Sequence, residues 1–368
     1  MNALYIGLMS GTSMDGVDAA LCEFEGFAFK GVTATHSIEY PHELRQRLLQ
    51  LQRAATSITL SEFAELDELT AEMFAQVTTD LLAQAGLVST QIAALGSHGQ
   101  TIFHDPLHAR SSLQLGDPNR IAARTGITTV ADFRRKDIAL GGHGAPLVPA
   151  FHQTMFGVTH ESRCILNLGG IANITLLPGN NQPVRGFDTG PGNGLMDEWV
   201  QQHLGQAFDA DGAFAAQGHA HGELLAALLA DPYFQQAPPK STGRGQFHLE
   251  WVRQRYPAVD KLPPTDVQRT LTELTARSVA DAMKAHAPAT QRLLVCGGGA
   301  RNGWLMQRLE KLTGLPVELT DTYGLPTQWV EAAAFGWLAM RRVHGLSGNL
   351  PAVTGASRET VLGGLFLP

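Results

Sequence analysis

The sequence predicts an α/β fold of two similar lobes around a central cleft. Three short strands joined by tight turns occur near the N-terminus and again from residue 164, and helices and further strands follow them both times. The chain has 368 residues and is 44% hydrophobic, which suffices for more than one buried core. We expect residues 1–133, completed by residues 345–368, to form the first lobe, and residues 134–344 to form the second.

The first lobe is expected to begin with strands at residues 4–9, 17–23 and 27–40, and their short connections predict antiparallel pairing. Thr59 and Glu62 have the spacing of a capping box, and apolar residues then recur at helical spacing up to Gly86. Two more strands are predicted at residues 92–95 and 127–130. Between them, Asp117 and Pro118 indicate the start of a short helix.

The second lobe repeats this order, with strands at residues 164–168 and 171–177 and a third strand that ends near Phe187. Helices are predicted at residues 196–204, 222–230 and 266–286. They are followed by a strand at 293–296, a helix from Asn302, a strand at 316–319 and a helix at 327–343. We expect the tail, residues 350–368, to pack back onto the first lobe.

Composition excludes several classes of protein. The net charge of −7 is spread without a long block of one sign, so a broad surface for nucleic acid is not expected. Cys22, Cys164 and Cys296 lie in apolar runs without metal or redox spacing, which predicts reduced core residues. The first nine residues lack the basic region of a signal peptide, and proline and asparagine interrupt the two long uncharged stretches. We therefore expect a cytoplasmic protein that does not bind membranes.

The connection between the first two strands is dense in small and polar residues. Its backbone N–H groups can approach an anion closely, and Ser10, Thr12 and Ser13 add hydroxyl donors. Two acids beside a phosphate are unfavourable unless Mg²⁺ lies between them and the nucleotide. The turn therefore predicts an ATP phosphate site rather than a plain hairpin, with Asp15 and Asp18 as candidate metal ligands. The candidate binding residues are Gly11, Thr12, Ser13, Met14, Asp15, Gly16, Val17 and Asp18.

Two later glycine-rich segments extend this nucleotide site. The turn after the strand at 164–168 matches the first turn by position, and a strand that enters a helix through Gly297, Gly298 and Gly299 suits a base or ribose. The candidate nucleotide-binding residues are Asn167, Gly169, Gly170, Gly190, Gly298, Gly299 and Asn302. The second turn alone is equally typical of a plain hairpin. The last segment, followed by Asp321, also resembles a dinucleotide-binding turn, although Asn302 occupies its third glycine position.

Asp188 is the candidate catalytic base. It lies in Gly186-Phe187-Asp188-Thr189-Gly190-Pro191-Gly192-Asn193-Gly194, where glycines allow a substrate to approach a single carboxylate near a strand end. The alternative is a helix N-cap, for which the spacing is too long. Glu331, in an otherwise apolar helix, is either a helix-end charge or a substrate contact.

Two further segments carry polar groups that a loop does not require. Ser97, His98 and Gln100 follow a predicted strand, and Arg134 and Arg135 precede the segment Gly141-Gly142-His143-Gly144. Such groups hold sugars, and arginine suits a substrate carboxylate. We expect these five residues to bind the substrate, with a solvated surface as the alternative for the two arginines.

Taken together, these motifs resemble those of the anhydro-N-acetylmuramic acid kinases almost from end to end. They are Met9-Ser10-Gly11-Thr12-Ser13-Met14-Asp15-Gly16-Val17-Asp18, Gly96-Ser97-His98-Gly99-Gln100-Thr101, Asp132-Phe133-Arg134, Asn167-Leu168-Gly169-Gly170-Ile171-Ala172-Asn173 and the segment around Asp188. The resemblance implies RNase H-like lobes of the actin-like ATPase and sugar kinase type, commonly in a homodimer. In the wider superfamily the first turn carries an acid where this chain has Met9, which leaves Asp15 or Asp18 to hold the metal.

The resemblance also implies a reaction. ATP and water open the 1,6-anhydro ring of anhydro-N-acetylmuramic acid, and O6 is phosphorylated to give N-acetylmuramic acid 6-phosphate in cell-wall recycling. Asp188 would deprotonate the water, and Glu331 would hold the sugar and position that water. The alternatives are an ordinary sugar or carboxylate kinase that cleaves no ring, and an ATP-driven binding module of the chaperone type, which needs a client-binding segment.

Overall fold

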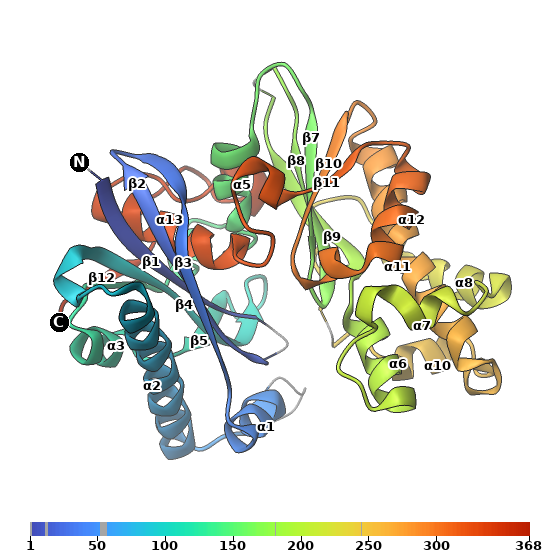
Figure 1. The fold of residues 1–368 in the computed structure, drawn as a ribbon, viewed down its shortest axis with the longest axis horizontal. Coiled ribbons are helices and arrows are strands. Elements are labelled where there is room, and N and C mark those ends of the chain that lie inside the picture. The colour runs from blue at the N-terminus through green and yellow to red at the C-terminus, as the bar shows by residue number, and fades with distance from the viewer. Residues whose placement is uncertain (1, 12–13, 52–56, 181, 244) are drawn as a thin grey trace. The chain divides into compact units, whose positions relative to one another are not determined.

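The chain folds into two compact units, which the computed structural model describes for residues 2–11, 14–51, 57–180, 182–243 and 245–368. Unit 1 comprises Met1–Met155 and Gly324–Pro368, and unit 2 comprises Phe156–Tyr323 (Figure 1). The sequence predicts the first division after residue 133, whereas unit 1 continues to Met155, and Asp137 in this stretch bonds to Asn349 and Thr354 of the tail. The sequence predicts the return to the first lobe after residue 344, whereas unit 1 resumes at Gly324 because the helix α13 (Val330–Val343) packs on its strands.

Mixed pairing organises the sheet of unit 1. Within the described residues its order is β12 (Gly364–Phe366), β6 (Thr129–Ala131), β4 (Ile92–Asp105), β1 (Asn2–Ser10), β2 (Gly16–Glu25) and β3 (Ala28–Glu39), with β5 (Ser111–Leu115) beside β4. β1, β2 and β3 form an antiparallel meander, whereas β4 pairs parallel to β1 and to β6. The tail strand β12 pairs antiparallel to β6. This register sets Asp18 opposite Met9 and Ser37, and Gln100 beside Ser10.

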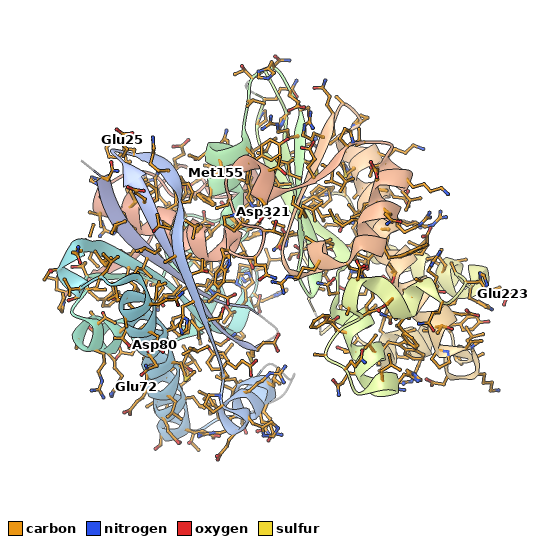
Figure 2. The ribbon with its side chains drawn as sticks, in the orientation of Figure 1. Glu25, Glu72, Asp80, Met155, Glu223 and Asp321 are labelled. Atoms are coloured by element: carbon orange, nitrogen blue, oxygen red, sulfur yellow. The ribbon has the colours of Figure 1, made fainter. Side chains whose placement is uncertain are left out.

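Helices cover both faces of this sheet, because successive side chains of a strand point to opposite faces. Ile6 and Leu8 of β1 join a core with Leu66 and Phe74 of α2 (Leu60–Ala85). Thr59 caps α2, since its Oγ1 accepts the Glu62 N–H at 3.1 Å, as the sequence predicts. Glu72 of α2, labelled in Figure 2, bonds to arginines of α3 (Pro118–Thr125).

On the other face, α13 lies directly against β1. A Cβ atom built on Gly7 would be 1.8 Å from the carbonyl oxygen of Ala332, so the strand and helix backbones meet where no side chain fits. This close approach places the N-terminus of α13, with Glu331, beside the sheet. The remaining helices of unit 1 are α1 (His42–Leu51), α4 (Arg135–Ala139), α5 (Val148–Phe156) and α14 (Pro351–Thr354).

The sheet of unit 2 has the same topology as the centre of the first sheet. Its described strands follow the order β11 (Val317–Leu319), β10 (Arg292–Cys296), β7 (Arg163–Leu168), β8 (Ile171–Leu177) and β9 (Arg185–Pro191). β7, β8 and β9 form an antiparallel meander, and β10 runs parallel to β7 and β11. The predicted internal repeat and the α/β fold of two similar lobes are therefore confirmed. The mixed sheet, with its antiparallel meander, differs from the parallel sheet of a dinucleotide-binding fold.

A large apolar core lies between this sheet and the helices of unit 2. Trp199, Leu271 and Leu305 are fully buried in it, and α11 and α12 run along the sheet in Figure 1. The helices are α6 (Gly194–Leu204), α7 (Ala213–Ala216), α8 (Gly222–Leu229), α9 (Pro232–Gln235), α10 (Leu249–Arg255), α11 (Pro264–His286) and α12 (Gly303–Thr313).

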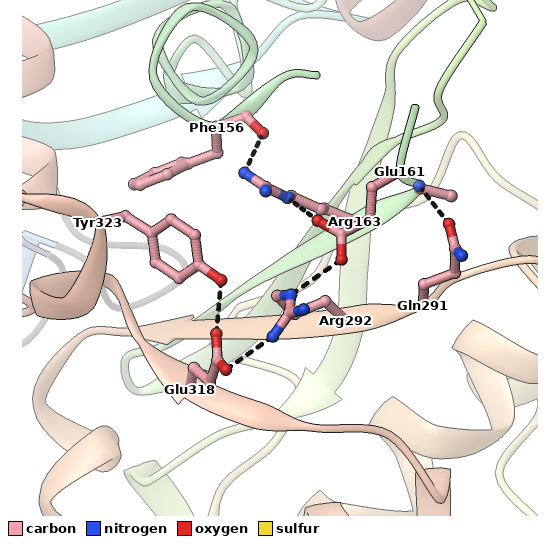
Figure 3. Close-up of polar contacts among 8 residues, drawn as sticks. Phe156, Glu161, Arg163, Gln291, Arg292, Glu318 and Tyr323 are labelled. Carbon is pink, nitrogen blue, oxygen red and sulfur yellow. Dashed lines mark hydrogen bonds and ion pairs between the residues drawn. The ribbon is translucent and has the colours of Figure 1, made fainter. Parts of the chain in front are cut away.

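The two ends of unit 2 meet in a polar network, drawn in Figure 3. The rings of Phe156 and Tyr323 are 6.3 Å apart, and Arg163 donates to the carbonyl oxygen of Phe156 at 3.0 Å. Glu161 pairs with Arg163 and with Arg292 at 2.6 and 2.9 Å. Figure 2 labels Met155, which precedes Phe156 in the chain, and Asp321, which lies two residues before Tyr323. This network ties the first and last residues of the unit to its sheet.

The expected cysteine environment is also confirmed: Cys22, Cys164 and Cys296 are buried thiols, and no disulfide joins them in the described part of the chain. In the described parts of the chain, no helix combines the length and apolar character that a bilayer crossing requires. The sequence missed β5, β12 and several short helices. It also ended the third strand of unit 2 near Phe187, whereas β9 continues to Pro191 because Ile171 and Ala172 pair with its last residues.

Candidate functional site

Buried side chains hold the first glycine turn, which joins β1 to β2, through hydrogen bonds to its backbone. Ser10 Oγ lies 2.7 Å from the Gly16 carbonyl oxygen and 2.6 Å from Gln100 Oε1. Gln100 Nε2 donates to the carbonyl oxygen of Gly11 at 3.2 Å, and Gln100 is fully buried. The structure therefore places Gln100, expected to touch the substrate, under the turn. Thr12 and Ser13, predicted to bind phosphate, lie outside the described residues.

The two acids of this turn have different surroundings. Asp15 is exposed and its carboxylate pairs with Arg45 at 2.7 Å. Asp18 accepts a 2.5 Å hydrogen bond from Ser37. Burial raises the pKa of Asp18, the bond from Ser37 lowers it, and the charge of Asp15 raises it. Asp18 is half-buried, so a nearby cation would offset the cost of its partial desolvation, which makes it the better candidate for a metal ligand.

Beside the turn, His98 and Arg134 form a direct contact. Arg134 Nη2 lies 2.7 Å from His98 Nε2, and Arg134 Nη1 donates to the Gly144 carbonyl oxygen at 2.8 Å. Burial and the charge of Arg134 hold the pKa of His98 well below its usual value, so the ring is neutral and accepts from Arg134. Burial lowers the pKa of Arg134 to about 10, which leaves it charged at neutral pH.

The other nitrogens of this pair, His98 Nδ1 and Arg134 Nε, are buried without a hydrogen-bond partner among the described residues, and the pair forms a polar cluster. Ser97 Oγ is also unpartnered, but Ser97 pairs with Leu8, which faces α2, whereas His98 packs on Phe335 of α13, so Ser97 points to the other face of the sheet. Buried polar atoms are paired in the great majority of cases, so an unpaired group of them indicates a bound ligand or water. Arg135, by contrast, is exposed and pairs with Asp132 at 2.8 Å. Of the two arginines predicted to bind substrate, Arg134 is the one in the polar cluster.

Glu331 extends this cluster from the first turn of α13. Burial and the charge of Asp18 raise the pKa of its carboxyl group, and the charge of Arg134 lowers it. Glu331 is thus electrostatically coupled to Asp18 and Arg134. This favours the substrate contact over the helix-end charge, because a coupled, partly buried carboxyl group is typical of a functional site.

In unit 2, the predicted glycine segments come together. Gly192 and Gly194 donate backbone hydrogen bonds to the Gly170 carbonyl oxygen at 3.0 and 3.1 Å, and Asn193 donates to that of Gly169 at 2.8 Å. A Cβ atom built on Gly299 would be 2.4 Å from Asn193 Oδ1. The third segment therefore packs on the first two, and only glycine fits there.

The ends of this glycine cluster are held by side chains. A Cβ atom on Gly297 would be 2.4 Å from Asn167 Oδ1, so Asn167 lies against the third segment. Asn302 is the N-cap of α12, where its Oδ1 accepts the Leu305 N–H at 3.0 Å. Asn167, Gly169, Gly170, Gly190, Gly298, Gly299 and Asn302 thus belong to adjoining segments of one unit.

Asp188 lies inside β9, next to this cluster. Its Oδ2 accepts the Thr242 N–H at 2.9 Å, and Oδ1 accepts no hydrogen bond from the described residues. Burial raises the pKa of Asp188 to about 6, while the bond from Thr242 and the charge of Lys240 lower it. A carboxylate with one unoccupied oxygen and a pKa near 6 can accept a proton from water near neutral pH.

Sequence reasoning missed the residues that support Asp188. Tyr233 donates its hydroxyl to the Asp188 carbonyl oxygen at 2.7 Å, and Lys240 donates to the Tyr233 carbonyl oxygen at 3.0 Å. The only available signal was the polar run Lys240-Ser241-Thr242, which nothing in the sequence links to Asp188.

Comparison with known proteins gives the family. The sequence matches the profile described as "Anhydro-N-acetylmuramic acid kinase" over residues 3–368. The chain belongs to the anhydro-N-acetylmuramic acid kinase family. A family member from Shewanella halifaxensis (strain HAW-EB4) is 52% identical over 367 residues, which cover 98% of each chain. A member from Xanthomonas campestris pv. campestris (strain 8004) is 50% identical and covers 99% of this chain and 97% of its own.

Solved structures share the fold at low sequence identity. The activator of the 2-hydroxyisocaproyl-CoA dehydratase from Clostridium difficile with bound ADPNP has a TM-score of 0.51 at 11% identity, and the match covers 93% of this chain and 96% of the other. Component A of the Acidaminococcus fermentans (R)-2-hydroxyglutaryl-CoA dehydratase has a TM-score of 0.50 at 9% identity, with 93% and 99% covered. The chain therefore shares its overall fold with these two proteins.

Proposed function

We propose that this protein is an ATP-dependent anhydro-N-acetylmuramic acid kinase, which opens the 1,6-anhydro ring with water and phosphorylates O6. The observation that carries the proposal is the contact of His98 with Arg134, whose Nδ1 and Nε atoms are buried without a partner among the described residues, in a chain that belongs to this family. These two N–H groups can donate to sugar oxygens, and the guanidinium of Arg134 suits a carboxylate such as the lactyl group. Glu331 would bind a sugar hydroxyl beside them.

In this proposal, Asp188 takes a proton from a water molecule whose oxygen bonds to the anomeric carbon. The bond between that carbon and O6 breaks, and O6 takes the γ-phosphoryl group of ATP. The products are N-acetylmuramic acid 6-phosphate and ADP, and the proton of the water stays on Asp188 until it is released. The pKa of Asp188, about 6, suits this role because the carboxylate is ionised at neutral pH yet basic enough to accept a proton.

On unit 2, the nucleotide would lie on the glycine segments, with its phosphates near Gly169 and its adenosine near Gly298. The first turn of unit 1, from Gly11, is the other candidate phosphate-binding segment. Mg²⁺ would be held by Asp18, whereas Asp15 is engaged by Arg45. The ion would neutralise the charge of the phosphates. Within the described residues no three acidic, histidine or cysteine side chains are grouped for a metal, which is compatible with an ion held by one or two carboxylates and the nucleotide.

The family resemblance extends the proposal to cell-wall recycling in the cytoplasm and to a homodimer. Light scattering coupled to size-exclusion chromatography tests the oligomeric state, since the monomer has a mass of 39.5 kDa.

The test of the reaction uses the anhydro-sugar, ATP and Mg²⁺ in ¹⁸O-labelled water. We expect one ¹⁸O at the C1 hydroxyl of the product and none in its phosphate. Unlabelled product incubated in the same water measures spontaneous exchange at C1. A phosphorylated sugar with an intact anhydro ring contradicts ring opening and supports an ordinary kinase, whereas no phosphorylated sugar contradicts both.

A further inference from the structure

Asp137, in α4, is a fully buried carboxylate that the reaction described above does not use. Its Oδ1 accepts from Asn349 Nδ2 at 2.7 Å and from Thr354 Oγ1 at 2.8 Å, and its Oδ2 accepts the Gly144 N–H at 2.8 Å. Among the described residues it has no ion pair with Lys, Arg or His. Burial of a carboxylate without a cation is costly, and here three hydrogen bonds offset that cost.

These bonds join two distant segments of unit 1. Asn349 and Thr354 belong to the C-terminal tail, whereas Gly144 ends the segment Gly141-Gly142-His143-Gly144. The His143 N–H also donates to the Thr354 carbonyl oxygen at 2.8 Å. Asp137 therefore fixes the position of the Gly144 segment against the tail.

The Gly144 segment in turn holds Arg134. The carbonyl oxygen of Gly144 accepts from Arg134 Nη1 at 2.8 Å, and the other end of the guanidinium lies 2.7 Å from His98 Nε2. With Gly144 on one side and His98 on the other, Arg134 keeps its unpartnered Nε within the polar cluster. The peptide unit that Asp137 anchors is one residue from the carbonyl group that orients this arginine.

We propose that Asp137 is a positioning residue, which acts through Gly144 to hold Arg134 in its sugar-binding orientation; this rests on the proposed function of Arg134. Asp137 does not touch the substrate. Its effect is on the binding of the sugar, because Arg134 is the group it orients, and the nucleotide segments of unit 2 are unaffected.

The test is Asp137→Asn, which keeps the size of the side chain. The amide oxygen is expected to stay with the two donors Asn349 and Thr354, so the NH₂ group faces the Gly144 N–H and that bond is lost. We expect KM for the anhydro-sugar to rise about tenfold, with KM for ATP unchanged. Thr354→Val is the matched control: it removes one donor from the tail, keeps the Gly144 bond and leaves both KM values within about twofold.

A double-mutant cycle separates positioning from a general loss of stability. In an Arg134→Ala background, Asp137→Asn is expected to raise the sugar KM no further, because the oriented group is already absent. An unchanged sugar KM in Asp137→Asn, an equal rise in Thr354→Val, or additive effects in the cycle overturns the proposal. If Asp137→Asn does not fold, Gly144→Ala serves instead, since its Cβ would lie 3.0 Å from the Arg134 carbonyl oxygen and displace the segment. An unchanged sugar KM there also overturns it.

A readout without substrate keeps this test apart from the proposed function. The His98 ring resonance, assigned by its loss in a His98→Gln variant, reports the charge of Arg134 beside it. We expect it to shift in Asp137→Asn and to stay in place in Thr354→Val. If the wild-type protein does not phosphorylate the sugar, the proposed function is contradicted. If the His98 resonance does not shift in Asp137→Asn, the positioning role of Asp137 is contradicted.

Discussion

The backbone N–H of Thr242 donates to Asp188 Oδ2 at 2.9 Å, and the Asp188 N–H donates to the Lys240 carbonyl oxygen at 3.2 Å. The loop that contains both partners thus holds the candidate base at its backbone and at one carboxylate oxygen. The bond from Thr242 favours the ionised form, while burial opposes it and raises the pKa to about 6. Asp188 is oriented through one oxygen, and the other is left to accept a proton.

Asp188→Asn is expected to lower kcat by several orders of magnitude, because an amide cannot take a proton from the attacking water. Nucleotide affinity stays unchanged, since the glycine segments are untouched. Stopped assays for ADP and isothermal titration with ATP measure the two quantities. The control is Asp281→Asn, an exposed acid on α11, which keeps full activity. Turnover retained in Asp188→Asn removes this residue from the mechanism.

The pH profile is expected to follow the ionisation of Asp188. The active form is the carboxylate, so kcat/KM falls as pH decreases below about 6, by about tenfold per unit. Lys240→Met removes a positive charge that lowers the pKa of Asp188, so the inflection moves to higher pH. Lys261→Met, at an exposed position, leaves it in place. If the inflection of the kcat/KM profile does not move in Lys240→Met, it does not report the ionisation of Asp188.

Arg134 and Arg135 are expected to differ in their effect on the sugar. Arg134→Ala removes a guanidinium of the polar cluster and raises the sugar KM by about two orders of magnitude. Arg135→Ala removes an exposed ion pair with Asp132 and changes KM by about twofold or less. Initial rates with the anhydro-sugar and with its analogue lacking the lactyl group measure both. The loss in Arg134→Ala shrinks with the analogue if Arg134 binds the carboxylate, and equal losses with both sugars refute that contact.

Gln100 is expected to act on the nucleotide rather than on the sugar. Its buried side chain bonds to Ser10 and Gly11 under the first turn, so Gln100→Ala loosens the turn and raises KM for ATP about tenfold. The sugar KM changes less. Gln84→Ala, an exposed change on α2, is the control. If the sugar KM alone rises, Gln100 touches the substrate, as the sequence suggested.

Gly7→Ala is expected to destabilise unit 1 by about 3 kcal/mol or more, because the new Cβ collides with a backbone that cannot yield easily. The nearest atom would be the Ala332 carbonyl oxygen, at 1.8 Å. Gly222→Ala is the control, as its Cβ would meet nothing within 4 Å. Thermal unfolding by calorimetry compares the variants. Equal Tm values for the two contradict the close packing of α13 on β1.

Local pattern sufficed for much of the fold. The capping of α2 by Thr59 and the start of α3 at Pro118 follow from residues within one turn of the chain, and the structure has both. The strands β5 and β12 were missed because their pairing partners are distant or irregular. β12 in particular is only three residues long and forms through its backbone pairing with β6. A segment this short has no alternation of apolar and polar residues from which a strand could be predicted.

The candidate site was predictable in its residue types and less so in their roles. Asp188, His98 and Arg134 stand out by chemistry among glycines and apolar strands. Gln100 and Arg135 look equivalent to their neighbours in the sequence, yet one is buried under a turn and the other is exposed. Nothing in the sequence linked Lys240 and Thr242 to the candidate site, because they lie in a loop more than fifty residues from Asp188 and reach it only in the folded chain.

The sequence by itself determined the repeated meander, its two glycine turns and the family, because strand periodicity and small residues are properties of short segments. Only the tertiary structure decided which polar atoms form hydrogen bonds within the protein and which remain available to a ligand. The parallel register of β1 and β4 brings Gln100 to Ser10, and the tail residues Asn349 and Thr354 donate to Asp137. Hydrogen bonds saturate, so a group engaged by a partner far along the chain is no longer available, and only the folded arrangement shows which groups these are.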